Sequence, residues 1–200
     1  MKGTPYIYQG EELGMTNRKC RDFSEFRDIE IKNAYRDFVG GGILDEETML
    51  KFVNAIGRDN ARFPMHWDDS DNAGFTTGTP WISVNENYKK INAAAQVNDP
   101  DSIFSYYKKL IELRHQMEII VYGVYKSKAI EHPDVFAYTR TLGDEKLFVV
   151  CNFREQEMDF TLEDGFTGDE KVLISNYDDV VKTENGIYLR PYEAKVFYRK

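Results

Sequence analysis

The chain has 200 residues, of which 42% are hydrophobic and 30% are charged, and its formal net charge is −8. This composition is typical of a globular protein, and the acidic balance argues against a nucleic-acid surface, because phosphate binding needs clustered Lys and Arg. The chain has no apolar run near the roughly 20 residues that span a bilayer. Its two cysteines, Cys20 and Cys151, lack the spacing of a disulfide framework or a metal site. We therefore expect a cytoplasmic protein with no nucleic-acid or membrane partner, no cofactor and no metal.

The first half of the chain is predicted to hold one strand, two helices and a long irregular segment. Residues 4–10 are rich in aromatic and β-branched side chains, which predicts a buried strand. Apolar residues at helical spacing predict helices over 28–38 and 46–56, with Asp45 as the cap of the second helix. From 57 to 99 the periodicity disappears, and an irregular stretch of this length is usually functional or disordered. Its many aromatic side chains argue against disorder.

The second half is predicted to hold one helix followed by strands. Asp99 and Pro100 suit the start of a helix over 100–117. After this helix the apolar period changes to two, and Gly143-Asp144 and Asn185-Gly186 are hairpin turn signals. The predicted strands are 119–126, 135–141, 146–153, 158–162, 170–175, 186–190 and 194–199. This pattern predicts a small antiparallel β-sandwich from about residue 120 to the end.

A dense group of charged and aromatic residues lies in the stretch "GRDNARFPMHWDDSDNAGF", residues 57–75. Arg58 and Arg62 are four residues apart and would share one face of a helix. The planar guanidinium suits paired oxygens, either of a carboxylate or of adjacent sugar hydroxyls. The alternative is that both arginines pair with Asp59, Asp68 or Asp69 and simply hold the loop. The spacing alone favours that alternative.

Other candidate residues have two readings each. Glu11 and Glu12 follow the predicted first strand, where a carboxylate can be catalytic in a parallel barrel, but a capping or ion-pairing role is favoured. Glu30 lies among polar residues of a helix, which is typical of a solvated face. Trp67 and Trp81 would either stack on sugar rings or form core beneath the long loop.

Two long stretches of the sequence carry a family resemblance. "MKGTPYIYQGEELGMTN" and "RDNARFPMHWDDSDNAGFTTGTPWISVNENY" resemble the retaining α-glucosidases of the α-amylase clan, in particular the oligo-1,6-glucosidase, dextran glucosidase and trehalose-6-phosphate hydrolase group. The resemblance covers the whole chain. It implies an α/β part followed by an all-β part. Residues 1–118 would be the last strand, long loop and helix of an incomplete (β/α)8 catalytic barrel, and residues 119–200 a C-terminal antiparallel β domain.

The same resemblance implies roles for three residues. Arg58 resembles the first arginine of an R-D-x-x-R stretch, which reaches the glucose in subsite −1. Arg62 resembles the second arginine, which helps to shape that pocket. Glu30, in the "DIE" stretch, resembles an acid that contacts the sugar in subsite +1. The chain departs from the family pattern at Phe63, where Thr is usual, and at His66, where Gln is usual.

The resemblance also implies what the chain lacks. The family cleaves glycosidic bonds with two carboxyl groups about 5 Å apart, and these lie on barrel strands four and five, with a third acid on strand seven. A whole barrel needs about 250 residues, and neither Glu11 nor Glu12 matches any of the three positions. We therefore expect the C-terminal portion of a hydrolase that acts on α-1,6 or related bonds of short oligosaccharides, inactive by itself. The alternative is a non-catalytic carbohydrate-binding or interaction module.

An incomplete barrel would leave apolar surface uncovered. A lone strand of a parallel barrel exposes both its edge and its faces. We therefore expect residues 1–95 to be partly disordered, rearranged or dimerised through the exposed barrel surface. The β domain should remain folded, because an antiparallel sandwich closes on its own core.

Overall fold

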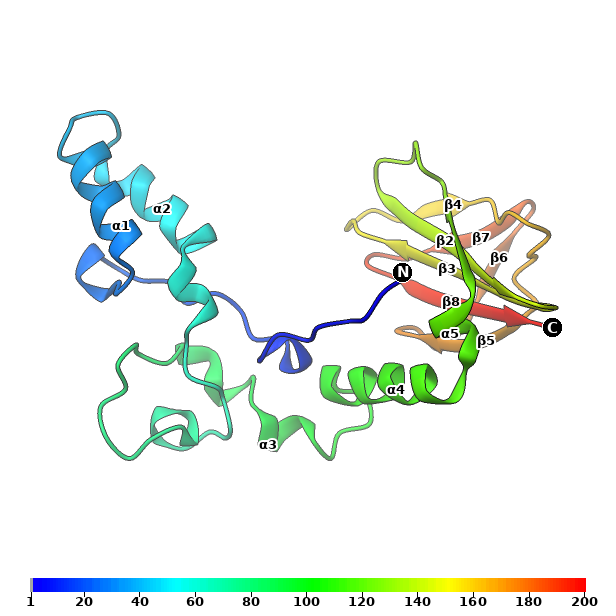
Figure 1. The fold of residues 1–200 in the computed structure, drawn as a ribbon, viewed down its shortest axis with the longest axis horizontal. Coiled ribbons are helices and arrows are strands. Elements are labelled where there is room, and N and C mark those ends of the chain that lie inside the picture. Colours follow the sequence, from blue (N-terminus) through cyan, green and yellow to red (C-terminus); the bar gives the residue numbers. More distant parts are fainter. Residues whose placement is uncertain (1) are drawn as a thin grey trace. The chain divides into compact units, whose positions relative to one another are not determined.

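The computed structural model describes residues 2–200, and these fall into two units (Figure 1). The helical unit is Tyr6–Lys108, and the β unit comprises Lys109–Lys200 with the first residues of the chain. The helices are α1 (Ile29–Ala34), α2 (Glu46–Ile56), α3 (Ala93–Gln96), α4 (Ile103–Gln116) and α5 (Glu118–Tyr122). Short 3-10 turns are η1 (Glu11–Leu13), η2 (Phe23–Glu25), η4 (Arg58–Ala61), η5 (Asp71–Gly74) and η6 (Glu86–Lys89), and η3 (Tyr35–Val39) is a π-helical turn. No helix among residues 2–200 is both long and apolar enough to cross a membrane.

The core of the helical unit forms where α1 and α2 lie together. Its buried side chains are Cys20, Phe26, Ile31, Met49 and Val53. The two predicted helices are confirmed, and the first continues from α1 into η3 before the three glycines end it. The predicted cap of α2 is also confirmed, because the Asp45 carboxylate accepts the Thr48 N–H at 2.8 Å.

The predicted strand over 4–10 is wrong for this chain. Residues 4–8 form neither helix nor strand, and Tyr6 is 91% exposed. A strand exists only when a neighbouring strand accepts and donates its backbone hydrogen bonds. All eight strands among the described residues lie within 124–199 and pair with one another. The segment has the composition of a strand but no partner.

The segment from 57 to 99 contains only α3 and three short 3-10 turns as regular structure, and side-chain amides hold it in place. Asn85 Nδ2 donates to the Thr16 carbonyl at 3.0 Å, and Gln96 Nε2 donates to the Leu13 carbonyl at 2.8 Å. These bonds satisfy backbone carbonyls that no helix or sheet would satisfy. The segment is therefore ordered onto residues 13–17, as the aromatic content of the sequence indicated.

The start of α4 differs from the prediction. Ser102, not Asp99, caps the helix, because Ser102 Oγ accepts the Ser105 N–H at 3.1 Å. Asp99 accepts the N–H of Asp101 at 2.9 Å in the preceding turn. The helix therefore begins at Ile103, three residues later than expected.

The predicted strand over 119–126 is also partly wrong, since its first half is helix α5. Ile119 on this helix is fully buried and packs with Leu147 and Leu173 on one face of a sheet. β-branched residues favour strands only weakly, and this packing overrides the preference. The strand that follows begins at Val124.

The β unit consists of two antiparallel sheets. The five-stranded sheet has the order β1-β2-β3-β8-β5, and the three-stranded sheet has the order β4-β7-β6. The strands are β1 (Val124–Lys128), β2 (Val135–Leu142), β3 (Glu145–Asn152), β4 (Met158–Phe160), β5 (Lys171–Ser175), β6 (Val181–Thr183), β7 (Gly186–Leu189) and β8 (Ala194–Arg199). The β-sandwich is therefore confirmed, and only the three-residue β6 was not predicted.

Alternate residues of these strands form the sandwich core. Ala137, Phe148 and Phe197 of the larger sheet pack with Ile187 and Leu189 of the smaller one, and all five are fully buried. Both predicted hairpins are present, the first with its turn at Gly143-Asp144 and the second with its turn at Glu184-Asn185, one residue earlier than predicted. At the second hairpin Gly186 is required, because an ideal Cβ there would lie 2.1 Å from the Phe160 carbonyl oxygen.

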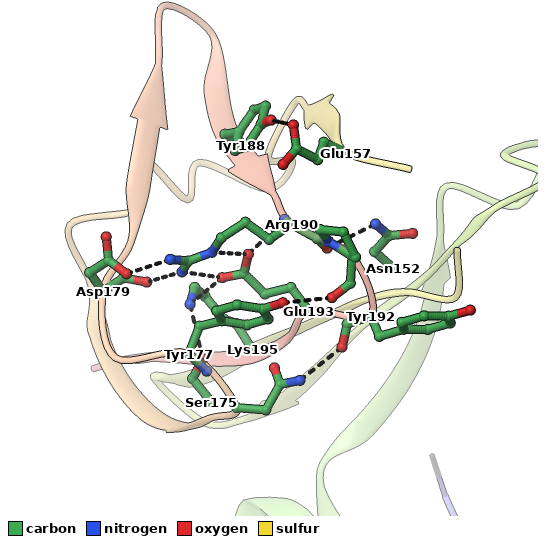
Figure 2. A network of polar contacts seen from close by, with 12 residues as sticks. Asn152, Glu157, Ser175, Tyr177, Asp179, Tyr188, Arg190, Tyr192, Glu193 and Lys195 are labelled. Atoms are coloured by element: carbon green, nitrogen blue, oxygen red, sulfur yellow. Dashed lines mark hydrogen bonds and ion pairs between the residues drawn. The ribbon is translucent and has the colours of Figure 1, made fainter. Parts of the chain in front are cut away.

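A buried cluster of charges lies at the start of β8 (Figure 2). Glu193 and Lys195 are almost fully buried and form an ion pair. The Glu193 carboxylate also accepts the Arg190 side chain at 3.0 Å and the Arg190 backbone N–H at 2.8 Å. On its outer side Arg190 donates to Asp179 at 2.7 Å and covers the Tyr177 ring. The cluster thus links the start of β8 to the segment before β6 and to the residue that follows β7.

Candidate functional site

The structure brings the predicted residues Arg58 and Glu30 together. The amide of Gly57 bonds the Val53 carbonyl at 2.8 Å, which ends α2 and starts the turn η4 that carries Arg58. Arg58 Nη1 lies 2.9 Å from Oε1 of Glu30, near the start of α1. The Arg58 side chain is 60% exposed and that of Glu30 is 68% exposed. An exposed pair of this kind is weak, so a ligand can displace either partner.

Arg62 has a different environment from Arg58. Its Nη1 donates to Oδ2 of Asp28 at 2.8 Å and to Oδ1 of Asp59 at 3.1 Å. Both carboxylates are almost completely buried. The alternative in which Asp59 holds an arginine is therefore confirmed for Arg62. Asp68, one of the two other expected partners, accepts the Ser70 N–H instead.

Asp28 connects the two arginines, and sequence reasoning did not select it. It caps α1 by accepting the Glu30 N–H at 2.8 Å, and its Oδ2 lies 3.7 Å from Nε of Arg58. The hydrogen bond from Arg62 and then that from the Glu30 amide hold the pKa of Asp28 below its ordinary value, although burial acts in the opposite direction. An Asp directly before an amphipathic helix is an N-cap signal, and this signal could have found it.

Two cavities open beside Arg58. One has a volume of about 350 Å³, and its lining includes Tyr8, Glu11, Asn60 and Phe63. The other has a volume of about 230 Å³, and its lining includes Glu30 and Asp28. Arg58 lines both cavities, whereas Glu30 lines only the second. Aromatic and aliphatic walls with a few convergent hydrogen-bonding groups are typical of small-molecule sites.

The acids that follow the N-terminal segment have a structural role. Glu12 accepts the Gly10 N–H at 2.8 Å, and Glu11 accepts the Tyr8 N–H at 3.2 Å. Neither side chain caps the turn η1; both accept backbone amides of the residues that precede it. Trp67 and Trp81 are 52% and 67% exposed, so their interpretation as core is wrong and stacking on a ligand stays a prediction.

The two positions that depart from the family pattern are both interior. Phe63 is buried and lines the larger cavity. His66 is fully buried, with Nδ1 2.8 Å from the Ile91 carbonyl oxygen, and its Nε2 has no hydrogen-bond partner among residues 2–200. Burial lowers the pKa of His66, partly offset by that carbonyl. His66 is therefore neutral at pH 7, with the proton on Nδ1.

No potential metal site accompanies these residues. Within residues 2–200, no three His, Cys, Asp or Glu side chains are grouped so that they could hold a metal ion. Cys20 and Cys151 are both free thiols. Burial raises the pKa of the Cys151 thiol to about 11.

Comparison with known proteins identifies the family. Residues 1–123 match the model described as alpha amylase, catalytic domain, and residues 135–196 match the alpha-amylase SusG C-terminal domain. The oligo-1,6-glucosidase of Parageobacillus thermoglucosidasius is 52% identical over 98% of this chain, and the trehalose-6-phosphate hydrolase of Bacillus subtilis is 46% identical over 98% of it. Each match covers 35% of the relative's length.

This chain also has the same fold as part of a solved structure. The crystal structure of Bacillus licheniformis trehalose-6-phosphate hydrolase, as its R201Q mutant, superposes with a TM-score of 0.92 at 46% identity. The superposition covers 99% of this chain and 36% of that chain. The chain thus spans about a third of the length of the proteins it matches, and it has both a barrel-derived segment and the C-terminal β domain. On this evidence the chain belongs to the alpha-amylase family.

Proposed function

We propose that this chain is the C-terminal portion of a retaining α-glucosidase that hydrolyses α-1,6 or related glucosidic bonds of short oligosaccharides. Its relatives are named oligo-1,6-glucosidase and trehalose-6-phosphate hydrolase. In this proposal the catalytic barrel contributes residues 1–118, and the β domain is 119–200. The nucleophile and the acid/base come from barrel strands outside this chain, so the chain alone is inactive.

The observation that carries the proposal is the Arg58–Glu30 pair beside the two cavities. The guanidinium offers several N–H donors in one plane, which fits adjacent sugar hydroxyls. The carboxylate offers acceptors for hydroxyl donors. In the proposed site Arg58 binds the glucose of subsite −1, Glu30 contacts the sugar of subsite +1, and Arg62 shapes the pocket through Asp28.

The proposed partners follow from the same site. The ligand is an oligosaccharide in the intact protein. Without the remainder of the barrel, a second copy of the chain would cover exposed side chains such as Tyr6 and Ile56, which are 91% and 80% exposed. The two free thiols support a cytoplasmic location.

The test uses the longer protein that contains this chain and the substrate p-nitrophenyl α-glucoside. Hydrolysis is expected, and Arg58→Ala should lower kcat/KM roughly 10- to 100-fold, because a hydrogen bond to a charged group contributes about 1.5–3 kcal/mol. Arg36→Ala is the matched control, since Arg36 is 70% exposed and pairs with its neighbour Asp37. Wild-type kinetics in Arg58→Ala would remove Arg58 from the site. No hydrolysis by the longer protein would favour the alternative of a non-catalytic binding module.

A further inference from the structure

Asp59 is the most heavily bonded carboxylate near the site. It is 2% exposed. Its Oδ2 accepts the backbone N–H of Arg27 at 2.6 Å and that of Asp28 at 3.1 Å, while its Oδ1 accepts Nη1 of Arg62 at 3.1 Å. One buried side chain therefore holds two segments that lie some 31 residues apart in sequence.

These two segments carry the two proposed sugar-binding groups. Arg58 precedes Asp59 directly in the turn η4, and Glu30 follows Asp28 by two residues. The Arg58–Glu30 pair cannot fix its own geometry, because both side chains are mostly exposed and exposed ion pairs are weak. The backbone segments that carry Arg58 and Glu30 must therefore set the separation between the two side chains. Asp59 supplies hydrogen bonds that join these two segments.

The chemistry of the three donors requires a carboxylate. Two backbone N–H groups and one guanidinium all donate, and an ionised Asp accepts at both oxygens. An Asn of the same shape has one oxygen and one NH2 group. In either orientation of the amide, its NH2 group faces an N–H donor. Either the two backbone bonds to Arg27 and Asp28 or the Arg62 contact is then lost.

We propose that Asp59 is a positioning residue of the sugar site, which acts through Arg62 and the backbone of 27–28 to set Arg58 against Glu30. This inference rests on the proposed function, in which Arg58 and Glu30 bind substrate. Asp59 itself does not touch the sugar. A displacement of about 1 Å at such a site can cost about 100-fold in rate, so a shift of the turn should be visible in kinetics.

The experiment is a double-mutant cycle in the longer protein. Asp59→Asn, Arg58→Ala and the double variant are assayed with p-nitrophenyl α-glucoside, with Asp69→Asn as the control at an exposed acid of the same segment. We expect Asp59→Asn to raise KM and to lower kcat/KM about tenfold or more. The double variant should be no worse than Arg58→Ala alone, because the side chain that Asp59 positions is already absent. Asp69→Asn should match wild type.

The outcomes separate this inference from the proposed function. If Asp59→Asn keeps the wild-type KM, or if its effect multiplies with that of Arg58→Ala, the positioning role is refuted while the sugar site stands. Wild-type kinetics in Arg58→Ala would overturn the proposed function itself. Should Asp59→Asn fail to fold, as judged by circular dichroism, Arg62→Gln takes its place in the cycle. It removes the guanidinium contacts to Oδ1 of Asp59 and Oδ2 of Asp28, and it leaves both backbone bonds of Asp59 in place. The same non-additivity with Arg58→Ala is then expected, and multiplicative effects would refute the inference.

Discussion

The buried cluster around Glu193 offers a direct test of how the β domain is held together. Glu193→Gln removes the negative charge that faces Lys195 and Arg190 (Figure 2). Arg190 keeps Asp179 at 2.7 Å and the Tyr177 ring at 4.1 Å. Lys195 is 1% exposed; in this variant it loses its ion pair and keeps the neutral hydroxyl of Ser175 at 2.9 Å. Most of the cost should therefore fall on Lys195.

The expected loss is about 3–5 kcal/mol in the free energy of unfolding of the β domain, as for other buried pairs that lose one partner. The double variant Glu193→Gln/Lys195→Met also removes the positive charge of Lys195. It should recover more than half of that loss, because no unpaired charge then stays buried at that position. Amide hydrogen exchange of β3 and β8 is the suitable assay. Both tryptophans lie within 57–99, so their fluorescence reports on the helical unit.

The same cluster predicts a pH dependence of known sign. Burial alone would raise the pKa of Glu193, but hydrogen bonds from Arg190 and Lys195 outweigh it and lower the pKa. A carboxyl group whose pKa is lower in the folded than in the unfolded state stabilises the fold at pH values above its unfolded-state pKa. That stabilisation is lost as the pH falls through the folded-state pKa. Glu193→Gln should lack this acid-side loss. A variant within 0.5 kcal/mol of wild type, or a double variant as unstable as the single one, would refute the assignment of the cost to an unpaired charge.

Two further predictions concern the helical unit. Protonating His66 would place a charge in a buried site, so wild-type stability should fall as pH decreases below the ordinary His value of 6.5, and His66→Gln should lose this dependence between about pH 6.5 and 5. Urea midpoints from tryptophan fluorescence measure it, and equal pH slopes in both proteins would contradict it. In a limited protease digest, cleavage within 6–95 should precede cleavage within 120–200, because the helical unit has the smaller core and more exposed apolar side chains. First cuts inside the β domain would contradict that order.

The sequence predicted those elements whose local signals agree with their packing. The helix over 46–56 has an amphipathic pattern, a capping Asp45 and a terminal Gly57, and the structure reproduces its limits. Several strands from 135 onwards carry the period-two pattern, and the pairs β2–β3 and β6–β7 are hairpins whose turns are local signals. Local pattern and fold coincide there.

The failures share a physical cause, which is dependence on a distant partner. Residues 4–10 have strand composition, but no second strand pairs with them among the described residues. Ile119 has strand propensity, but its burial against Leu147 and Leu173 requires a helix. At the site, Arg58 and Glu30 were selected by resemblance. The N-cap signal could have selected Asp28, but the bonds of Asp28 and Asp59 join segments about 30 residues apart, and no local pattern predicts those bonds.

The most direct test of the account compares two purified proteins, the 200-residue chain and the longer protein that contains it, on p-nitrophenyl α-glucoside and on short α-1,6-linked oligosaccharides. The account predicts turnover by the longer protein and none by the 200-residue chain. Turnover by the 200-residue chain alone would contradict it.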